Sequence, residues 1–180
     1  MNFSTPSTTV RRLGAAGLLL LLAATSSTSA LAAPGAGDAA PPALGTDIEG
    51  DPVNLKQFAG KAVIVTFWAT WCGYCIKELP ILENIQNKAG KAQMQVIAVN
   101  TEPREVFRKA ARALKSLSLM VAHDTGEKAF AAYGGTGLPH MAIIGRDGRI
   151  IRIYRGYDER SLNAIVADVN QALQMAVPEE

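Results

Sequence analysis

Residues 65–75 read VTFWATWCGYC, a β-branched and aromatic run that passes directly into two cysteines separated by two residues. The apolar run extends back to Ala62, and such a run without polar alternation is typical of a strand buried on both faces. After Cys72 the apolar residues take the spacing of a helix, which we expect to end at Gly90. The stretch therefore predicts a strand-to-helix junction with Cys72 at the beginning of the helix.

The position of the two cysteines favours redox chemistry over a structural cross-link. A helix N-terminus presents unpaired backbone N–H groups and a favourable dipole, which we expect to stabilise the thiolate of Cys72 and make it a nucleophile. Cys75, one turn further along, could then attack the mixed disulfide and release the product. A ring closed by so few residues constrains the unfolded chain little, so a purely structural disulfide is the weaker interpretation.

The remainder of the chain alternates between strand and helix patterns. We expect a small hairpin at 44–55, a strand at 94–100, a helix from 103 to about 117, a short strand at 119–122, a brief helix at 126–133, strands at 141–144 and 150–154 joined by a turn, and a final helix at about 159–177. This order predicts an α/β fold in which helices flank both faces of a mixed central sheet.

The first 32 residues have the organisation of a secretory signal peptide, with arginines at 11–12, an apolar stretch at 13–24 and small residues after it. The apolar stretch is shorter than the roughly 20 residues of a membrane-spanning helix. We therefore expect a cleavable signal peptide and a periplasmic location, with an uncleaved N-terminal membrane anchor as the alternative. Residues 33–43, nearly all Ala, Pro and Gly, are expected to form a flexible linker to a domain at 44–180.

Charge and cysteine content exclude several classes of function. The chain has 18 Lys and Arg against 16 Asp and Glu, and the first 32 residues hold two of the basic residues and none of the acidic ones. Without a basic stripe, we expect no nucleic-acid partner. The chain has only two cysteines, so its stability must come from a hydrophobic core and not from a set of disulfides.

The string FWATWCGYC at 67–75, with Gly-Leu-Pro at 137–139 and the strand at 141–144 behind it, resembles the thioredoxin superfamily. Within the superfamily it is similar to the TlpA/ResA group of exported thiol-disulfide oxidoreductases. The resemblance covers about residues 44–177 and implies a thioredoxin fold with an N-terminal hairpin. The helix at 103–117 stands where these exported proteins carry an insertion.

The resemblance also implies roles for residues outside the cysteine pair. Thioredoxin has a buried Asp at the position of Thr66, whereas the TlpA/ResA group has a Glu three residues after the second cysteine, as Glu78 is here. Glu78 is then expected to take up and return the proton of Cys75; the alternative is a solvated Glu paired with a lysine. Pro139 matches the family's cis-proline beside the cysteines, and Leu138 would offer its backbone to a substrate strand.

Three residues around Cys72 are expected to line the substrate surface: Trp71, Gly73 and Tyr74. The Gly-Tyr pair is also found in periplasmic disulfide isomerases and is not the Pro-containing pair usual for the TlpA/ResA group, so a disulfide oxidase or isomerase stays open. His140 stands where Thr is common. It could stabilise the thiolate and make the site more oxidising, or it could point away.

Together these features predict a periplasmic protein-disulfide reductase that cycles Cys72 and Cys75 between dithiol and disulfide. It would receive electrons from a membrane thiol-disulfide carrier and pass them to oxidised proteins, with cytochrome c or metalloprotein maturation as one such role. A metal-binding module that uses both thiols and His140 is the alternative of another class. We expect no cofactor, no bound metal, a monomer, and a structural role for His123.

Overall fold

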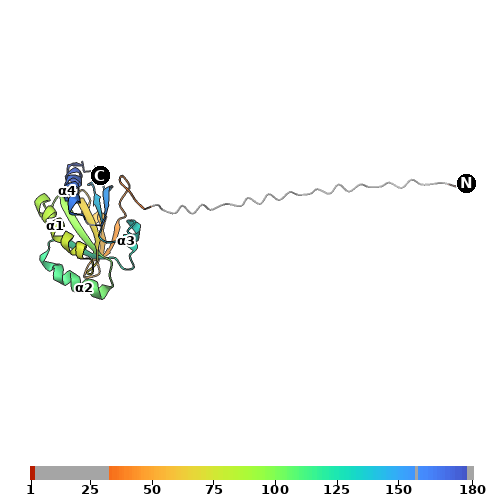
Figure 1. Cartoon of the computed structure of the whole chain (residues 1–180). Coiled ribbons are helices and arrows are strands. Elements are labelled where there is room, and N and C mark those ends of the chain that lie inside the picture. The colour runs from red at the N-terminus through yellow and green to blue at the C-terminus, as the bar shows by residue number, and fades with distance from the viewer. Residues whose placement is uncertain (3–32, 157, 178–180) are drawn as a thin grey trace. The chain divides into compact units, whose positions relative to one another are not determined.

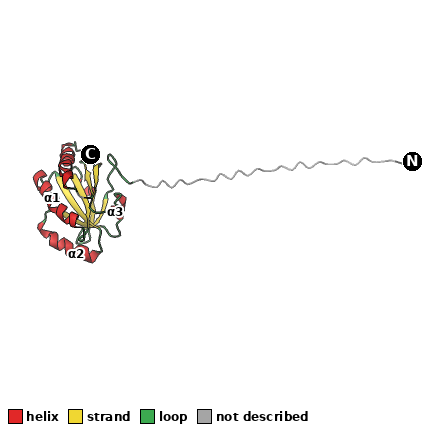
Figure 2. Ribbon diagram, in the orientation of Figure 1, coloured by secondary structure: helices red, strands yellow, loops and turns green. Residues whose placement is uncertain are grey.

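The computed structural model describes residues 1–2, 33–156 and 158–177. Apart from residues 1–2, the expected signal peptide lies outside this part of the chain, as does Pro178. The described domain is a sheet of seven strands with helices on both of its faces (Figures 1 and 2). Within the described ranges, none of the helices has the length and apolar character needed to span a bilayer.

The strands confirm the mixed sheet and the N-terminal hairpin. They are β1 (Ala43–Thr46), β2 (Pro52–Asn54), β3 (Ala62–Trp68), β4 (Met94–Asn100), β5 (Met120–His123), β6 (His140–Ile144) and β7 (Ile150–Arg155). Their order across the sheet is β2-β1-β5-β4-β3-β6-β7. β3, β4 and β5 pair in parallel, and the other neighbours pair antiparallel. All of β3 is buried, as its continuous apolar run predicts.

The helices are α1 (Gly73–Ala89), α2 (Arg104–Ala113), α3 (Lys128–Ala132) and α4 (Leu162–Gln174), with 3-10 turns η1 (Leu55–Phe58), η2 (Leu114–Ser116) and η3 (Glu159–Ser161). α1 and α4 cover one face of the sheet and α3 covers the other (Figure 1). α2 and η2 together fill the expected 103–117, which confirms the inserted helix. α4 begins later than expected because residues 159–161 form a separate turn.

Side chains of β3 alternate between two cores, because successive residues of a strand face opposite sides of the sheet. Val65 and Phe67 belong to the core under α3. Ile64 and Trp68 belong to the clusters under α1 and α4. Thr66, between Val65 and Phe67, faces α1 and reaches one of its side chains. This alternation decides which residues can approach the cysteines.

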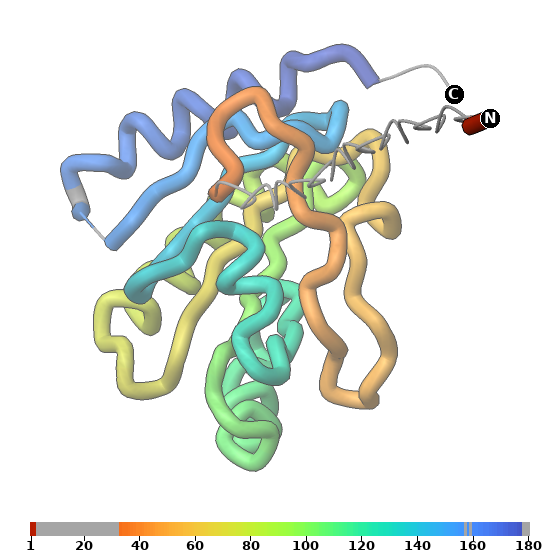
Figure 3. The backbone as a smooth tube through the Cα atoms, turned by 90° about the vertical axis from the view of Figure 1, so that its right-hand side faces the viewer, coloured from red at the N-terminus to blue at the C-terminus, as the bar shows by residue number. Residues whose placement is uncertain are grey.

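The segment before β1 differs from the flexible linker expected over 33–43. The backbone N–H of Ile150 donates to the carbonyl of Asp38 (2.9 Å), and the hydroxyl of Tyr133 donates to the carbonyl of Pro41 (2.9 Å). Figure 3 shows this segment, in orange, beside the hairpin that β6 and β7 form. Backbone hydrogen bonds do not depend on large side chains, so a segment of small residues can be fixed to the domain by them. The prediction of a flexible linker is wrong for the second half of the segment.

Candidate active site

The two cysteines form a disulfide at the beginning of α1, with their Cα atoms 5.2 Å apart. Cys72 is the N-cap of the helix, and its Sγ accepts a hydrogen bond from the backbone N–H of Cys75 (3.2 Å). The buried strand β3 ends four residues before Cys72, so the cysteine lies at a strand-to-helix junction, as the sequence predicts. When the disulfide opens, the same N–H can stabilise negative charge on the sulfur of Cys72.

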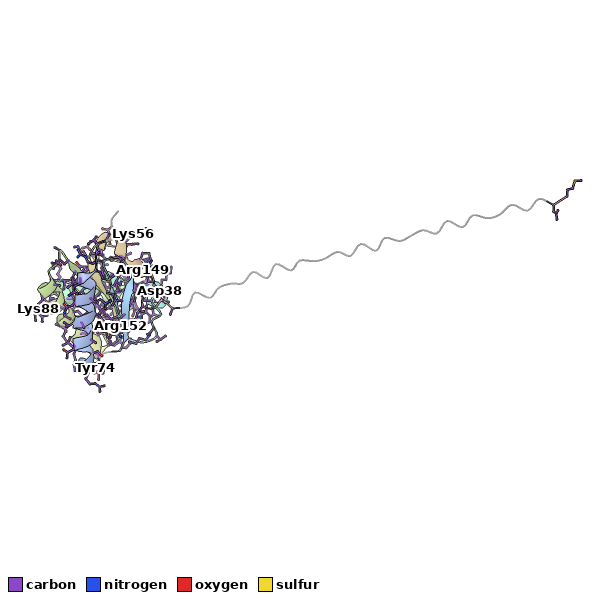
Figure 4. The ribbon with its side chains drawn as sticks, turned by 90° about the horizontal axis from the view of Figure 1, so that it is seen from above. Asp38, Lys56, Tyr74, Lys88, Arg149 and Arg152 are labelled. Atoms are coloured by element: carbon purple, nitrogen blue, oxygen red, sulfur yellow. A yellow bond between two sulfur atoms is a disulfide. The ribbon has the colours of Figure 1, made fainter. Side chains whose placement is uncertain are left out.

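The two cysteines differ in their exposure. Cys72 is 6% exposed and Cys75 is 0% exposed, so a large partner reaches Cys72 first. Around Cys72 the surface is aromatic, since Trp71 is 73% exposed and Tyr74 is 60% exposed. Figure 4 shows Tyr74 at the outer edge of the domain. Gly73 between them has open space where a side chain would begin.

The loop before β6 lies beside this surface. The peptide bond between Leu138 and Pro139 is cis, as the resemblance implies. Leu138 packs against the hydrophobic cluster that contains both cysteines. The carbonyl of Pro139 accepts a hydrogen bond from Gly156 (2.8 Å), which ties the loop to the end of β7. Among the described residues, the backbone of Leu138 has no hydrogen-bond partner, so its N–H and carbonyl are available to a bound chain.

A carboxyl group lies buried behind the cysteines. Glu78 follows Cys75 by one turn on the inner face of α1 and is 4% exposed. Its Oε2 accepts a hydrogen bond from Oγ1 of Thr66 (2.9 Å). Burial raises the pKa of Glu78 to about 7, and the bond from Thr66 offsets part of that rise. Glu78 is therefore not the solvated residue considered as the alternative.

In the sequence, Thr66 stands out only as a departure from thioredoxin. The structure shows that its hydroxyl is the hydrogen-bond donor to Glu78, across the gap between β3 and α1. The signal available in the sequence was a polar residue inside an otherwise apolar buried strand. Such a residue needs a partner, because an unpaired buried hydroxyl is unfavourable.

His140 follows Pro139 directly, but its side chain lies in the core under α3. Its Nε2 donates to the carbonyl of Tyr133 (3.0 Å), and its ring contacts those of Phe67 and Phe130. The ring is fully buried, and burial lowers its pKa. Of the two options left open by the sequence, the structure has His140 pointing away from α1.

The other histidine has the structural role expected of it. His123 stacks on Phe107, with ring centroids 4.9 Å apart, and its Nε2 donates to the carbonyl of Glu102 (2.7 Å). In the part of the chain that the structure describes, no group of three or more His, Cys, Asp or Glu side chains is placed to hold a metal ion. The geometry thus adds nothing in favour of a Cys/His metal-binding module.

A buried parallel strand that leads into two cysteines at a helix N-terminus, beside a cis-proline, defines a thiol-disulfide oxidoreductase of the thioredoxin fold. The chain belongs to the redoxin family, whose model, described as Redoxin, matches residues 35–173. The match begins close to the point where the described chain starts to hydrogen-bond with β7.

Individual relatives agree with this class. The thiol-disulfide oxidoreductase ResA of Bacillus thuringiensis subsp. konkukian is 33% identical over 120 residues, which are 67% of this chain and 69% of the relative. A candidate thiol:disulfide interchange protein DsbE from Chlorobium tepidum superposes with a TM-score of 0.68 at 27% identity, over 79% of this chain and 99% of that one. A candidate protein disulfide isomerase from Bacteroides thetaiotaomicron gives 0.67 at 28% identity, over 80% and 96%. The protein is a ResA-like thiol-disulfide oxidoreductase that acts on protein thiols and disulfides.

Proposed function

We propose that this enzyme is a periplasmic protein-disulfide reductase, exported by a cleavable signal peptide at 1–32. The arginine pair, the short apolar stretch and the small residues after it support export. Retention of the segment as a membrane anchor facing the periplasm is the alternative. The length of the N-terminus in the protein isolated from the periplasm, measured by mass spectrometry, distinguishes the two.

In the proposed reaction, the thiolate of Cys72 attacks one sulfur of the substrate disulfide, and the other sulfur leaves as a thiolate that takes a proton. The thiol of Cys75 gives its proton to Glu78 and attacks the sulfur of Cys72, and the second substrate sulfur leaves as a thiolate that takes a proton from solvent, to which Glu78 later gives up the proton of Cys75. The substrate gains two electrons and two protons, and the enzyme disulfide forms. A membrane thiol-disulfide carrier then restores the dithiol by the same exchange.

Glu78 suits the role of proton acceptor because of its position and its pKa. It lies one helical turn from Cys75, within the same buried layer of α1. A pKa of about 7 makes both the protonated and the ionised form accessible near neutral pH, as proton transfer in each direction requires.

The proposed direction of electron flow rests on one observation: Glu78 lies on the side of the sheet under α1, whereas His140 lies on the opposite side. A strongly oxidising site needs a stabilised thiolate. His140, the residue that could have supplied a positive charge, is enclosed under α3, and burial disfavours its charged form. The buried ionisable group on α1 is instead an acid, whose negative charge disfavours a thiolate beside it. Both features favour a reductase.

Substrate docking is proposed for the surface around Cys72. Trp71 and Tyr74 offer exposed aromatic area, and Gly73 leaves room between them. Leu138, ahead of Pro139, can pair its backbone with an extended substrate segment. Oxidised apocytochromes c and metalloprotein assembly factors are the proposed substrates, and the enzyme is proposed to act as a monomer.

The test is the reduction potential of the Cys72/Cys75 pair, measured on protein beginning at Ala33 and equilibrated in glutathione or dithiothreitol buffers. A value near thioredoxin's, about −270 mV, is expected for a reductase. A value of about −180 to −120 mV would replace the reductase by an oxidase or isomerase, the second candidate that the Gly73-Tyr74 pair favours.

A further inference from the structure

The turn between β3 and α1 leads to Cys72, and the carboxylate of Glu102 binds this turn through two hydrogen bonds. Within the turn itself, the backbone N–H of Cys72 donates to the carbonyl of Ala69 (3.1 Å). Thr70, in the middle of the turn, donates its backbone N–H to Oε2 of Glu102 (2.6 Å) and its hydroxyl to Oε1 of the same residue (2.8 Å). Each oxygen of the Glu102 carboxylate therefore accepts one hydrogen bond from Thr70.

Glu102 is itself held by the ends of two strands. Asn100, the last residue of β4, donates from Nδ2 to Oε2 of Glu102 (3.1 Å) and accepts at Oδ1 from the backbone N–H of Glu102 (3.0 Å). His123, the last residue of β5, donates from Nε2 to the Glu102 carbonyl (2.7 Å). Asn100 and His123 are both buried. Glu102 is thus attached to the ends of two strands of the sheet, and its bonds to Thr70 restrict the movement of the turn.

This contact matters most after reduction. In the oxidised protein the disulfide ties Cys72 to Cys75, but in the dithiol that bond is absent. Trp71 is largely exposed and packs little against the domain, so it does not hold the turn in place. On its helix side Cys72 is held by its carbonyl, which accepts from the backbone N–H of Ile76 (3.2 Å), and on the side of the turn the bonds from Thr70 to Glu102 limit where the attacking sulfur lies.

We propose that Glu102 is a positioning residue for thiol-disulfide exchange. It fixes the turn through Thr70 so that the sulfur of Cys72 and the ring of Trp71 together meet a docked protein disulfide in the geometry that exchange requires. Glu102 touches neither sulfur. The inference rests on the oxidoreductase activity and applies to either direction of electron flow.

The experiment compares Glu102→Ala with Glu105→Ala, which removes an exposed acid from the first turn of α2. Two rates are measured on the reduced proteins. One is the rate at which they reduce disulfide-bonded insulin by exchange, and the other is the rate of alkylation by iodoacetamide as a function of pH. Exchange requires a positioned sulfur, whereas a small alkylating reagent reacts with any accessible thiolate. We expect Glu102→Ala to slow exchange about tenfold and to leave unchanged the alkylation rate reached at high pH, where the thiol is fully ionised. We expect Glu105→Ala to change neither rate.

Glu102→Gln separates position from charge. Its amide oxygen can accept from the N–H of Thr70 and its amide nitrogen can donate to the Thr70 hydroxyl, so the turn stays bound and we expect near wild-type exchange. An exchange rate as low as that of Glu102→Ala would overturn the proposal, because charge would then be the cause. So would a Glu102→Ala protein that melts at lower temperature but keeps both wild-type rates, since that result describes a structural role alone.

Thr70→Val covers the case in which Glu102→Ala fails to fold. It removes the hydroxyl bond and keeps the backbone bond, and we expect exchange to fall about threefold; an unchanged rate would count against the proposal. Oxidation of a reduced cysteine-containing peptide by the oxidised proteins is measured in parallel. Wild-type protein that oxidises this peptide but leaves insulin intact would contradict the reductase function, while the ratio between variants in the oxidation assay would still test Glu102.

Discussion

Glu78 and His140 are both buried ionisable side chains close in sequence to the redox motifs, yet they lie in different cores. Thr66 of β3 faces α1 and donates to Glu78, whereas Phe67, the next residue of that strand, contacts the ring of His140. His140 is also the residue paired with Phe67 in the register of β3 and β6. Which side chains share the face of the sheet under α1 with the cysteines therefore depends on strand alternation and not on proximity along the chain.

The largest effect we expect from this difference is on the pH dependence of stability. Folding raises the pKa of Glu78 from 4.5 to about 7, so folding favours its protonated form. The stability that this carboxyl contributes is present below its unfolded pKa and is lost as the pH rises through the folded one, a change of about 3 kcal/mol. Denaturant unfolding of the oxidised wild type and Glu78→Gln, from pH about 5 to about 8, should show this loss in the wild type alone. A difference between the two proteins that is constant with pH would contradict it.

A second effect concerns turnover. If Glu78 accepts the proton of Cys75, Glu78→Gln should lower the rate of insulin reduction about 100-fold, as expected for the loss of a general base. The matched change in the other core, His140→Thr, should leave turnover within about twofold, because that ring does not face α1. Equal losses in the two variants would remove the distinction between the cores.

His140→Thr should have its effect on stability. The smaller side chain leaves the hydrogen bond to Tyr133 unmade and space among the aromatic rings, and we expect a loss of about 2 kcal/mol near neutral pH. Burial lowers the pKa of His140, so wild-type stability falls as the pH drops through the unfolded value, and the variant should lack that fall. The reduction potential should stay within about 15 mV of wild type, and a larger shift would show that His140 acts on the cysteines.

The smallest effect sharpens the role of Thr66. Thr66→Val keeps the shape of the side chain and removes the bond that holds the Glu78 pKa down. For a hydrogen bond of about 1 kcal/mol, the folded-state pKa of Glu78, and with it the upper end of the pH range over which stability is lost, should move upward by about 0.7 pH unit. Unfolding measured across the same pH range checks this, and an upper end that stays in place would show that the bond has no influence on the pKa of Glu78.

Much of the fold could be predicted because its signals are local. The apolar run of β3, the helical spacing after Cys72 and the turn between β6 and β7 each lie within a short stretch of sequence. Glu78 was identified through the resemblance to the TlpA/ResA group, which has a Glu at the same distance after the second cysteine. These predictions needed no knowledge of which distant segments meet.

The late start of α4 is a local error, whereas the linker error and the omission of Glu102 both involve distant partners. The segment around Asp38 reads as a linker, but it is held by backbone bonds to β7, more than a hundred residues further on. Glu102 gave no signal in the sequence, since its partner Thr70 is 32 residues away. Nothing in the local pattern of an exposed-looking acid after a strand distinguishes it from a solvated one.

The class of fold, the cysteine pair at the helix N-terminus and the chemistry that the pair can perform follow from local properties of the sequence, namely period, residue type and spacing. Three features are seen only in the folded domain: Glu78 is buried against Thr66, His140 belongs to the opposite core, and Glu102 binds the turn before Cys72. Those outcomes depend on strand register and on which loop ends meet at one edge of the sheet, and both bring together residues that are far apart in the sequence.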